Sequence, residues 1–334
     1  MYPLACIDGY RIPTREEVYM LDIIPFTCGP ATISSDQKLS LFDPLSLKTG
    51  PTLNLVTNHG NITSARAFDP ANSVACTAGE NGTVSLWDLR QDVRQAQVAR
   101  FETGQVPVLS VACSNMGYSV AAGTELQNHQ ASIIIWDVRS TAAPKLHYKE
   151  IHSDDVTELN FHPNDPNILL SGSTDGLVNI CDTRITDEDE VIIQTFNHDS
   201  SIHHAAFLND TEVYAISHDE RLALYDMAEG YEKGAATTDF GDMRAVLGCQ
   251  YVANIFAKAN GAGAVIGAGT HGQQAFELIH LTKGETWALD RDNSVGLPGA
   301  HSEEIVRSFC FYDEAQMVFS AGEDGFLRAW RANA

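Results

Sequence analysis

The chain has 334 residues, and 44% of them are hydrophobic, so it can bury a large core and is not a disordered polypeptide. Its 21 basic and 44 acidic side chains give a formal net charge of −23. A charge of this size disfavours direct contact with nucleic acid or with an anionic membrane, because both would repel the protein.

Two features predict where the protein resides. The N-terminal residues lack the basic and apolar regions of a secretion signal, and no apolar run approaches the roughly 18 residues of a membrane span. The seven cysteines are spread singly, without a CxxC pair, which is typical of reduced thiols. We therefore expect an intracellular protein of the nucleus, the cytoplasm or both, and not a secreted one.

A repeat organises the whole chain. Bulky or core residues recur with a mean spacing of about 48 residues, at Phe42, Trp87, Trp136, Cys181, Tyr225, Phe276 and Trp330. In five of these units an Asp or Asn lies six residues earlier, at Asp36, Asn81, Asp175, Asp219 and Asp324. Seven recurrences at one period predict seven supersecondary units.

Taken in chain order, the expected units span residues 15–57, 58–104, 105–150, 151–196, 197–240, 241–290 and 291–334. The fourth shows the pattern most clearly: strands are expected at 156–161, 168–173, 177–182 and 191–196, and Asp175-Gly176 predicts a tight hairpin turn. No stretch sustains a 3.6-residue period, so we expect almost no helix. Seven four-stranded units predict an all-β ring without long exposed sheet edges.

The two ends of the chain are expected to close this ring. The last unit runs out of residues after Trp330, before it could form an outer strand. The segment 3–10 precedes the first inner strand, at 18–25, and can supply the missing strand. We therefore expect one closed domain over residues 1–334, in which the N-terminal strand completes the last unit.

The repeat resembles the WD40-repeat β-propeller family over essentially the whole chain. In that family a His, a Ser or Thr, an Asp and a Trp form a hydrogen-bonded tetrad inside each blade. The resemblance implies a complete tetrad only in the last unit, from His301, Ser320, Asp324 and Trp330. Cys181 replaces the Trp of the fourth unit, and Ala215 and Tyr225 predict an incomplete network in the fifth.

A narrower resemblance lies within this family. The segments IHSDDVTELNFHPNDPNILLSGSTDGLVNICD, AAGTELQNHQASIIIWDVR and EEIVRSFCF are similar to the WD-repeat-containing protein 89 group. This resemblance implies a seven-bladed propeller and supplies no biochemical role.

Candidate catalytic and metal sites are weak. The run GAGAVIG at 261–267 is followed by strand residues where a dinucleotide fingerprint needs a helix. His198, His203, His204 and His218 cluster in the sequence, but neighbours 203 and 204 on one strand should face opposite ways, which disfavours a metal site. The Ser, His and Asp residues of the repeat serve structural tetrads. We expect no enzyme activity, catalytic residue, metal or cofactor.

Acidic residues precede the inner strands of five units. In WD40 propellers these loops open on the top face, around the central channel, and here they carry Glu16, Glu17, Asp154, Asp155, Asp199, Asp242, Glu303 and Glu304. Only Arg15 and Arg244 oppose them in the same windows. Such a rim would bind an Arg/Lys-rich protein segment through several charge-assisted pairs. Alternatively, a protein of this charge collects acid in all its solvated loops, as at 187–190.

A second functional interpretation rests on two WDxR sequences, 87–90 and 136–139. They resemble the motif by which some WD40 proteins dock, as substrate receptors, onto a cullin-type ubiquitin-ligase adaptor, and Arg90 and Arg139 would make that contact. WDxR is also common in propellers where the Arg pairs locally.

The sequence therefore predicts a non-catalytic interaction scaffold whose acidic top face binds a basic protein segment, as an escort, chaperone or assembly factor for a ribosomal protein, a histone or a similar protein. The ligase receptor is the alternative. We expect a monomer or a subunit of a larger complex, without direct nucleic-acid or membrane contact.

Overall fold

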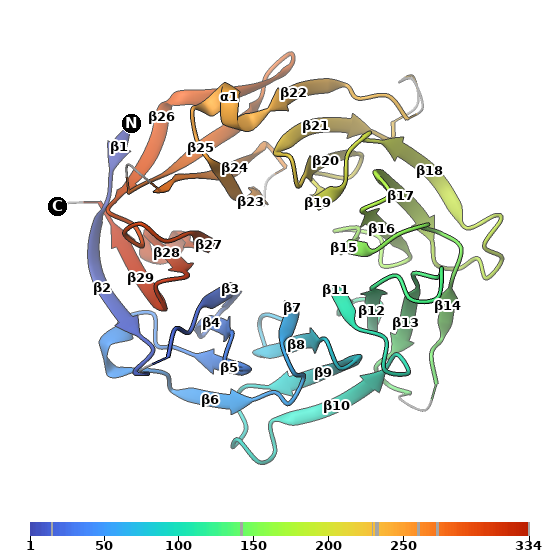
Figure 1. The fold of residues 1–334 in the computed structure, drawn as a ribbon, viewed down its shortest axis with the longest axis horizontal. Coiled ribbons are helices and arrows are strands. Elements are labelled where there is room, and N and C mark those ends of the chain that lie inside the picture. Colours follow the sequence, from blue (N-terminus) through green and yellow to red (C-terminus); the bar gives the residue numbers. More distant parts are fainter. Residues whose placement is uncertain are drawn as a thin grey trace.

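The computed structural model describes residues 1–14, 16–140, 143–228, 230, 234–258, 261–271 and 274–332. Seven antiparallel sheets stand around a central channel like the blades of a propeller (Figure 1). In each blade the first strand lies beside the channel and the last strand lies at the circumference. The predicted all-β, seven-bladed propeller is confirmed.

The first five blades each use four strands in chain order, from the channel outward. Blade one contains β3 Met20–Phe26, β4 Gly29–Ser34, β5 Lys38–Leu41 and β6 Leu53–Val56, and blade two contains β7 Ile62–Asp69, β8 Val74–Gly79, β9 Thr83–Asp88 and β10 Gln97–Glu102. Blade three contains β11 Val108–Ser114, β12 Ser119–Thr124, β13 Ile133–Asp137 and β14 Leu146–Tyr148, and blade four contains β15 Val156–Phe161, β16 Ile168–Ser173, β17 Leu177–Asp182 and β18 Ile192–Asn197. Blade five contains β19 Ile202–Phe207, β20 Glu212–Ser217, β21 Arg221–Asp226 and β22 Thr238–Asp242.

The last two blades share the N-terminal segment. Blade six contains β23 Tyr251–Ala257, β24 Gly263–Thr270, β25 Ala275–Lys283 and β26 Trp287–Pro298, and blade seven contains β27 Val306–Tyr312, β28 Met317–Gly322 and β29 Phe326–Arg331. β2 (Ala5–Arg11) pairs antiparallel with β29 as the outer strand of blade seven, so the predicted closure by the N-terminal strand is confirmed. β1 (Tyr2–Pro3) also pairs in parallel with β26, so the N-terminal segment joins two blades (Figure 1).

Three strands run past the unit boundaries expected from the sequence. β18 extends to Asn197, beyond residue 196, β22 extends to Asp242, beyond residue 240, and β26 extends to Pro298, beyond residue 290. The sixth unit carries almost none of the repeat signature, so no residue in it marks where its outer strand ends.

Among the described elements three short segments are helical: α1 Met243–Leu247, the 3₁₀ turn η1 Leu47–Thr49 and the 3₁₀ turn η3 Asp313–Ala315. The Asp242 side chain caps α1 by accepting a hydrogen bond from the backbone N–H of Arg244, and Gly248 ends the helix in the left-handed conformation. Within the described residues no helix has the length and apolar character needed to cross a membrane.

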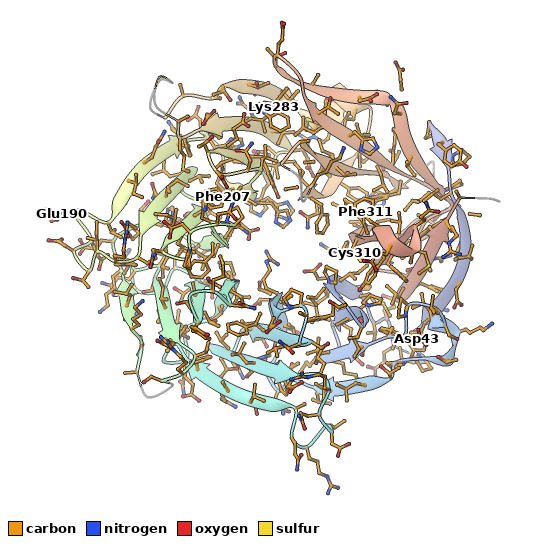
Figure 2. The ribbon with its side chains drawn as sticks, turned by 180° about the vertical axis from the view of Figure 1, so that it is seen from behind. Asp43, Glu190, Phe207, Lys283, Cys310 and Phe311 are labelled. Atoms are coloured by element: carbon orange, nitrogen blue, oxygen red, sulfur yellow. The ribbon has the colours of Figure 1, made fainter. Side chains whose placement is uncertain are left out.

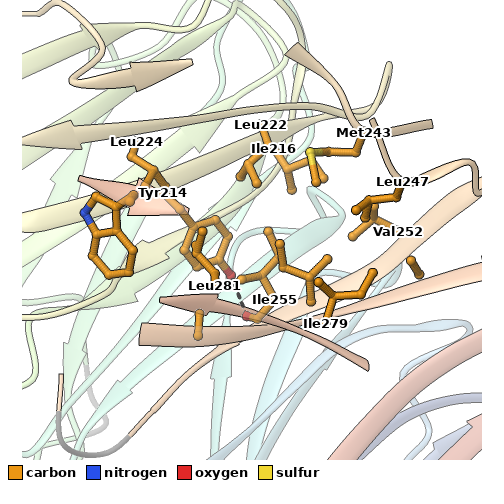
Figure 3. Close-up of a cluster of buried hydrophobic side chains, with 14 of the residues drawn as sticks. Tyr214, Ile216, Leu222, Leu224, Met243, Leu247, Val252, Ile255, Ile279 and Leu281 are labelled. Atoms are coloured by element: carbon orange, nitrogen blue, oxygen red, sulfur yellow. Dashed lines mark hydrogen bonds between the residues drawn. The ribbon is translucent and has the colours of Figure 1, made fainter. Parts of the chain in front are cut away.

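The core lies between neighbouring blades. The largest cluster joins Ile216, Leu222 and Leu224 of blade five to Ile255 and Ile279 of blade six (Figure 3). The Tyr214 hydroxyl donates a hydrogen bond of 2.9 Å to the carbonyl oxygen of Ile255 across this interface. Each fully buried side chain of this size contributes roughly 1.5–3 kcal/mol, so blade-to-blade packing holds the ring rigid.

Every inner strand contains a bulge near its start. The register shifts at Leu21, Thr63, Leu109, Thr157, His203, Ala253 and Arg307, and all seven residues line the channel. A bulge lets two consecutive residues face the same side of a strand. The residues that follow are polar in all seven blades: Asp22, Ser64, Ser110, Glu158, His204, Asn254 and Ser308.

Candidate functional site

The loops before the inner strands and the hairpins between the second and third strands of the blades form one face, which we call the top face. Backbone hydrogen bonds join the two kinds of loop in several blades, among them those from Thr174 to Asp155, from His218 to Ser201 and from Glu323 to Ile305. The predicted acidic residues belong to these loops.

The structure divides the eight predicted carboxylates into two groups. Five are exposed and have no side-chain hydrogen bond or ion pair within the described part of the chain: Glu16, Glu17, Asp199, Glu303 and Glu304. We call these the free carboxylates. The other three, Asp154, Asp155 and Asp242, are partly buried and occupied in local structure.

Each of these three has a local partner. Asp155 accepts a hydrogen bond of 2.7 Å from the backbone N–H of Leu126, and Asp154 accepts one of 2.8 Å from the N–H of Asp155. Asp242 caps α1 and pairs with the Arg244 guanidinium at 2.9 Å, and these hydrogen bonds lower its pKa. The sequence shows acid at these positions but does not reveal which carboxylates are already paired.

The acidic side chains of the loops before the inner strands form an arc and not a complete ring. The loops before the inner strands of blades two and three, residues 57–61 and 103–107, contain no acidic side chain. The 187–190 loop lies elsewhere: Figure 2 places Glu190 at the circumference, and Glu188 accepts hydrogen bonds from the backbone N–H groups of Lys149 and Glu150. The free carboxylates therefore lie over blades one, five and seven.

Inside the arc, the channel encloses a cavity of about 860 Å³. The Arg66 guanidinium lies 2.9 Å from the Glu158 carboxylate and 3.8 Å from that of Asp22, so it links blades one, two and four. Glu158 also lies 2.9 Å from Nδ1 of His204, and the Ser308 hydroxyl donates to Asp22 at 2.7 Å. Burial alone would raise the pKa of Glu158, but Arg66 and His204 outweigh it and lower that pKa.

Three imidazole rings pack against one another in tilted pairs on the channel side of blade five. The rings of His203 and His204 are 4.1 Å apart and those of His203 and His218 are 4.8 Å apart. The expectation that residues 203 and 204 face opposite ways is wrong, because the bulge between Ile202 and His204 turns both rings toward the channel. Burial lowers the pKa of His203 to about 3, so that ring is neutral. No group of metal-binding side chains occurs among the described residues.

The tetrad of blade seven is a buried hydrogen-bonded network. His301 bonds Asp324 through Nδ1 at 2.6 Å and the Ser320 hydroxyl through Nε2 at 2.8 Å, and the Trp330 indole N–H also donates to Ser320 at 2.8 Å. Because the Ser320 hydroxyl is completely buried, it holds the blade together and is not presented to a substrate.

Blade two contains an equivalent network that was not expected from the sequence. His59 bonds Thr77 at 2.7 Å and Thr83 at 2.6 Å, Trp87 donates to Thr77 at 2.7 Å, and Asn81 accepts from Thr83 at 2.6 Å. The spacing of ten residues from Thr77 to Trp87, equal to that from Ser320 to Trp330, is the signal that could have revealed it.

Family models match most of the chain. The model described as "Nucleolar protein 10-like, N-terminal domain" matches residues 31–225, and the model "WD domain, G-beta repeat" matches residues 294–331. The chain belongs to the nucleolar protein 10-like family of WD repeat propellers.

Relatives and solved structures agree with this assignment. An uncharacterised WD repeat-containing protein of Schizosaccharomyces pombe is 31% identical over 97% of this chain and 98% of its own length. A WD repeat-containing protein 89 homolog of Dictyostelium discoideum is 24% identical over 70% of this chain and 60% of its own, which confirms the resemblance to that group. A chain in a crystal structure of the mitotic checkpoint complex shares the fold, with a TM-score of 0.72 and 16% identity over 99% of this chain and 92% of that chain.

This WD repeat protein has the fold of a protein-interaction scaffold, because WD40 propellers typically bind protein partners and are typically not enzymes. Its WDxR arginines pair within their own turns. Arg90 lies 2.8 Å from Asp88, and Arg139 lies 2.6 Å from Asp137, each through two guanidinium nitrogens. Arg184 of blade four repeats this geometry with Asp182 at 2.5 Å. The three arginines therefore stabilise a turn that recurs in successive blades.

Proposed function

We propose that this protein is a non-catalytic scaffold whose acidic top face binds a basic, Arg/Lys-rich protein segment. The observation that carries the proposal is the set of free carboxylates, Glu16, Glu17, Asp199, Glu303 and Glu304, held over three blades of one rigid face. Charge-assisted hydrogen bonds from Arg or Lys satisfy such groups directly.

The electrostatics favour fast, salt-sensitive binding. A net charge of −23 attracts a basic segment over a distance, and the channel mouth concentrates the field. Each exposed ion pair contributes only about 0–1 kcal/mol, so several pairs must form together. The affinity should therefore fall steeply as salt is added.

The family description supports a class of partner. A nucleolar protein 10-like domain is compatible with a nucleolar role, and ribosomal proteins and histones are basic proteins that need a shield before assembly. We propose that this protein escorts such a partner, or helps to assemble it, in the nucleus or the cytoplasm. The same charge makes direct binding to nucleic acid unfavourable.

Affinity capture from native extract tests the proposal. The test variant carries Glu16→Lys, Glu17→Lys, Glu303→Lys and Glu304→Lys. The control variant carries Asp189→Lys, Glu190→Lys, Asp313→Lys and Glu314→Lys, which make the same change in net charge on exposed loops at the other end of the strands.

Basic proteins should be captured by the wild type and the control variant at low salt, and they should be lost from the test variant. If the test variant captures the same basic proteins as the control, the acidic side chains of the top face serve only solubility, and the proposal fails.

A further inference from the structure

Two hairpins on the top face carry a long polar side chain where three equivalent hairpins carry glycine. In five blades a three-residue turn joins the second and third strands, and the N–H of its third residue donates to the carbonyl of the last residue of the second strand. That third residue has a positive φ in every case. It is Gly82, Gly176 and Gly325 in blades two, four and seven, with φ of 77°, 85° and 72°.

Blade five places Glu220 at this position, with φ of 61°, and blade one places Gln37 there, with φ of 66°. The left-handed region is favourable for glycine and unfavourable for long L side chains, which lack the short polar groups that help Asn and Asp. Blade five therefore keeps a carboxylate where its own backbone favours glycine. Strain of this kind is concentrated at functional sites.

The Glu220 side chain is half-buried and lines the channel cavity together with His203, His218 and Tyr251. Its Oε2 atom is buried and has no hydrogen-bond donor among the described residues. Burial raises the pKa of this carboxyl group to about 6. A buried carboxylate oxygen without a donor is unfavourable, so it indicates a missing partner.

The cations around this carboxylate are already paired. Arg307 bonds Glu323, Arg244 bonds Asp242 at 2.9 Å, and Arg66 bonds Glu158 at 2.9 Å. The exposed His218 ring lines the same cavity two residues before Glu220, and it packs against the neutral His203 ring at 4.8 Å. An imidazole surface near a carboxylate with one unpaired oxygen is complementary to a planar guanidinium, which stacks and donates several hydrogen bonds.

We propose that Glu220, His203 and His218 form an arginine pocket at the channel mouth, which receives one Arg side chain of the basic segment. This inference rests on the proposed function. The free carboxylates would attract any basic segment, and the arginine pocket would select Arg over Lys and fix the register of the bound segment.

Fluorescence anisotropy with labelled nona-arginine and nona-lysine tests the pocket. Wild-type protein should bind nona-arginine about tenfold more tightly than nona-lysine. Glu220→Gly and Glu220→Gln should remove this preference and change the affinity for nona-lysine less than about twofold. His218→Ala should weaken the preference through loss of the stacking surface.

Gln37→Gly is the matched control, because it makes the same backbone change in blade one. It should leave the preference intact. Thermal denaturation tests the strain separately: Glu220→Gly and Gln37→Gly should each melt a few degrees above the wild type, which also shows that both variants fold.

The outcomes separate the two proposals. If the wild type binds both peptides equally, or if Glu220→Gly keeps the Arg preference, the arginine pocket is overturned and the acidic face stands. If the wild type binds neither peptide, both proposals fail. If the variant with lysines at 16, 17, 303 and 304 loses both peptides while Glu220→Gly loses only the preference, both proposals hold.

Discussion

Blades five and seven each bury a histidine, but different residues bond its two ring nitrogens. In blade seven the buried His301 bonds Asp324 and Ser320, and Trp330 completes the network. In blade five Ala215 replaces the serine, and His198 bonds the Tyr225 hydroxyl at 2.9 Å and the Arg221 carbonyl oxygen at 3.0 Å. The tetrad of blade five is incomplete, as expected, because Ala215 has no hydroxyl and Asp219 does not bond His198, but both nitrogens of His198 find other partners.

The difference changes what each hairpin can do. In blade seven Asp324 bonds both His301 and Arg328, and Gly325 completes the turn. In blade five Asp219 has no bond to His198 and lies 3.3 Å from the Ser200 hydroxyl. The Asp324 side chain in the hairpin of blade seven is therefore bonded within its own blade. The hairpin of blade five instead presents His218 and Glu220 to the channel.

Removal of the Trp330 indole should have the largest effect on this comparison. Trp330→Ala should lower the free energy of unfolding by about 3–5 kcal/mol, because it opens a cavity and leaves Ser320 without its donor. Trp330 also pairs with Cys6 of the closing strand β2. Urea denaturation measures the loss. A loss below about 1 kcal/mol would show that the tetrad does not hold blade seven.

Removal of one hydroxyl group in each blade sharpens the comparison. Tyr225→Phe and Ser320→Ala each leave a buried imidazole nitrogen without a partner, so each should lower the free energy of unfolding by about 1–3 kcal/mol. The two losses should be similar in urea denaturation. A neutral Tyr225→Phe beside a costly Ser320→Ala would mean that Tyr225 does not replace the serine.

The contributions of Glu220 and of Asp324 to the stability of the fold should change with pH in opposite directions. The pKa of Glu220 is raised from 4.5 to about 6, so the folded state holds this proton more tightly and loses stability as pH rises through that interval. Glu220→Gln should therefore raise the melting temperature most above about pH 6 and little below pH 4.5.

Asp324 provides the opposite case. Burial would raise its pKa, but His301 and Arg328 lower it below the ordinary 3.8, so its stabilising effect is present above that pH and is lost on acidification. Asp324→Asn should lower the melting temperature at neutral pH and have progressively less effect below pH 4. If the melting temperatures of Glu220→Gln and Asp324→Asn changed with pH in the same way, the opposite pKa shifts of Glu220 and Asp324 would be contradicted.

The smallest effect is expected from the WDxR turns. Arg90→Ala with Arg139→Ala should leave the urea midpoint nearly unchanged, because both arginine side chains are largely exposed to solvent. Binding of basic peptides to the top face should also stay the same. Loss of binding to a cullin-type ubiquitin-ligase adaptor in this double variant would instead support the ligase-receptor alternative.

Much of the fold could be predicted from the chain. Trp87, Trp136 and Trp330 mark units two, three and seven, because each blade must bury a bulky residue at the same depth. The prediction that the segment 3–10 completes the last blade is confirmed by the pairing of β2 with β29. The end of blade six was not predicted, since Phe276 is the only repeat mark in that unit, although Pro298-Gly299 is a turn signal that could have located it.

The sequence also placed acidic residues on the loops of the top face, but it could not show that the Glu303 carboxylate is free while that of Asp155 accepts a hydrogen bond. That distinction depends on the N–H of Leu126, which is 29 residues away along the chain and 2.7 Å away in space. The position of Glu220 in a glycine turn could have been found by aligning the five hairpins.

The sequence by itself determined the number of blades, the ring and the sign of its charge, because these follow from periodicity, chain length and composition. The tertiary structure alone decided the chemistry of the channel. Asp22, Arg66, Glu158 and His204 come from four different blades, and they meet because the ring brings every inner strand to one axis. The paired orientation of His203 and His204 depends on a backbone bulge, whose register is set by hydrogen bonds to the neighbouring strand and is not encoded in local side-chain alternation.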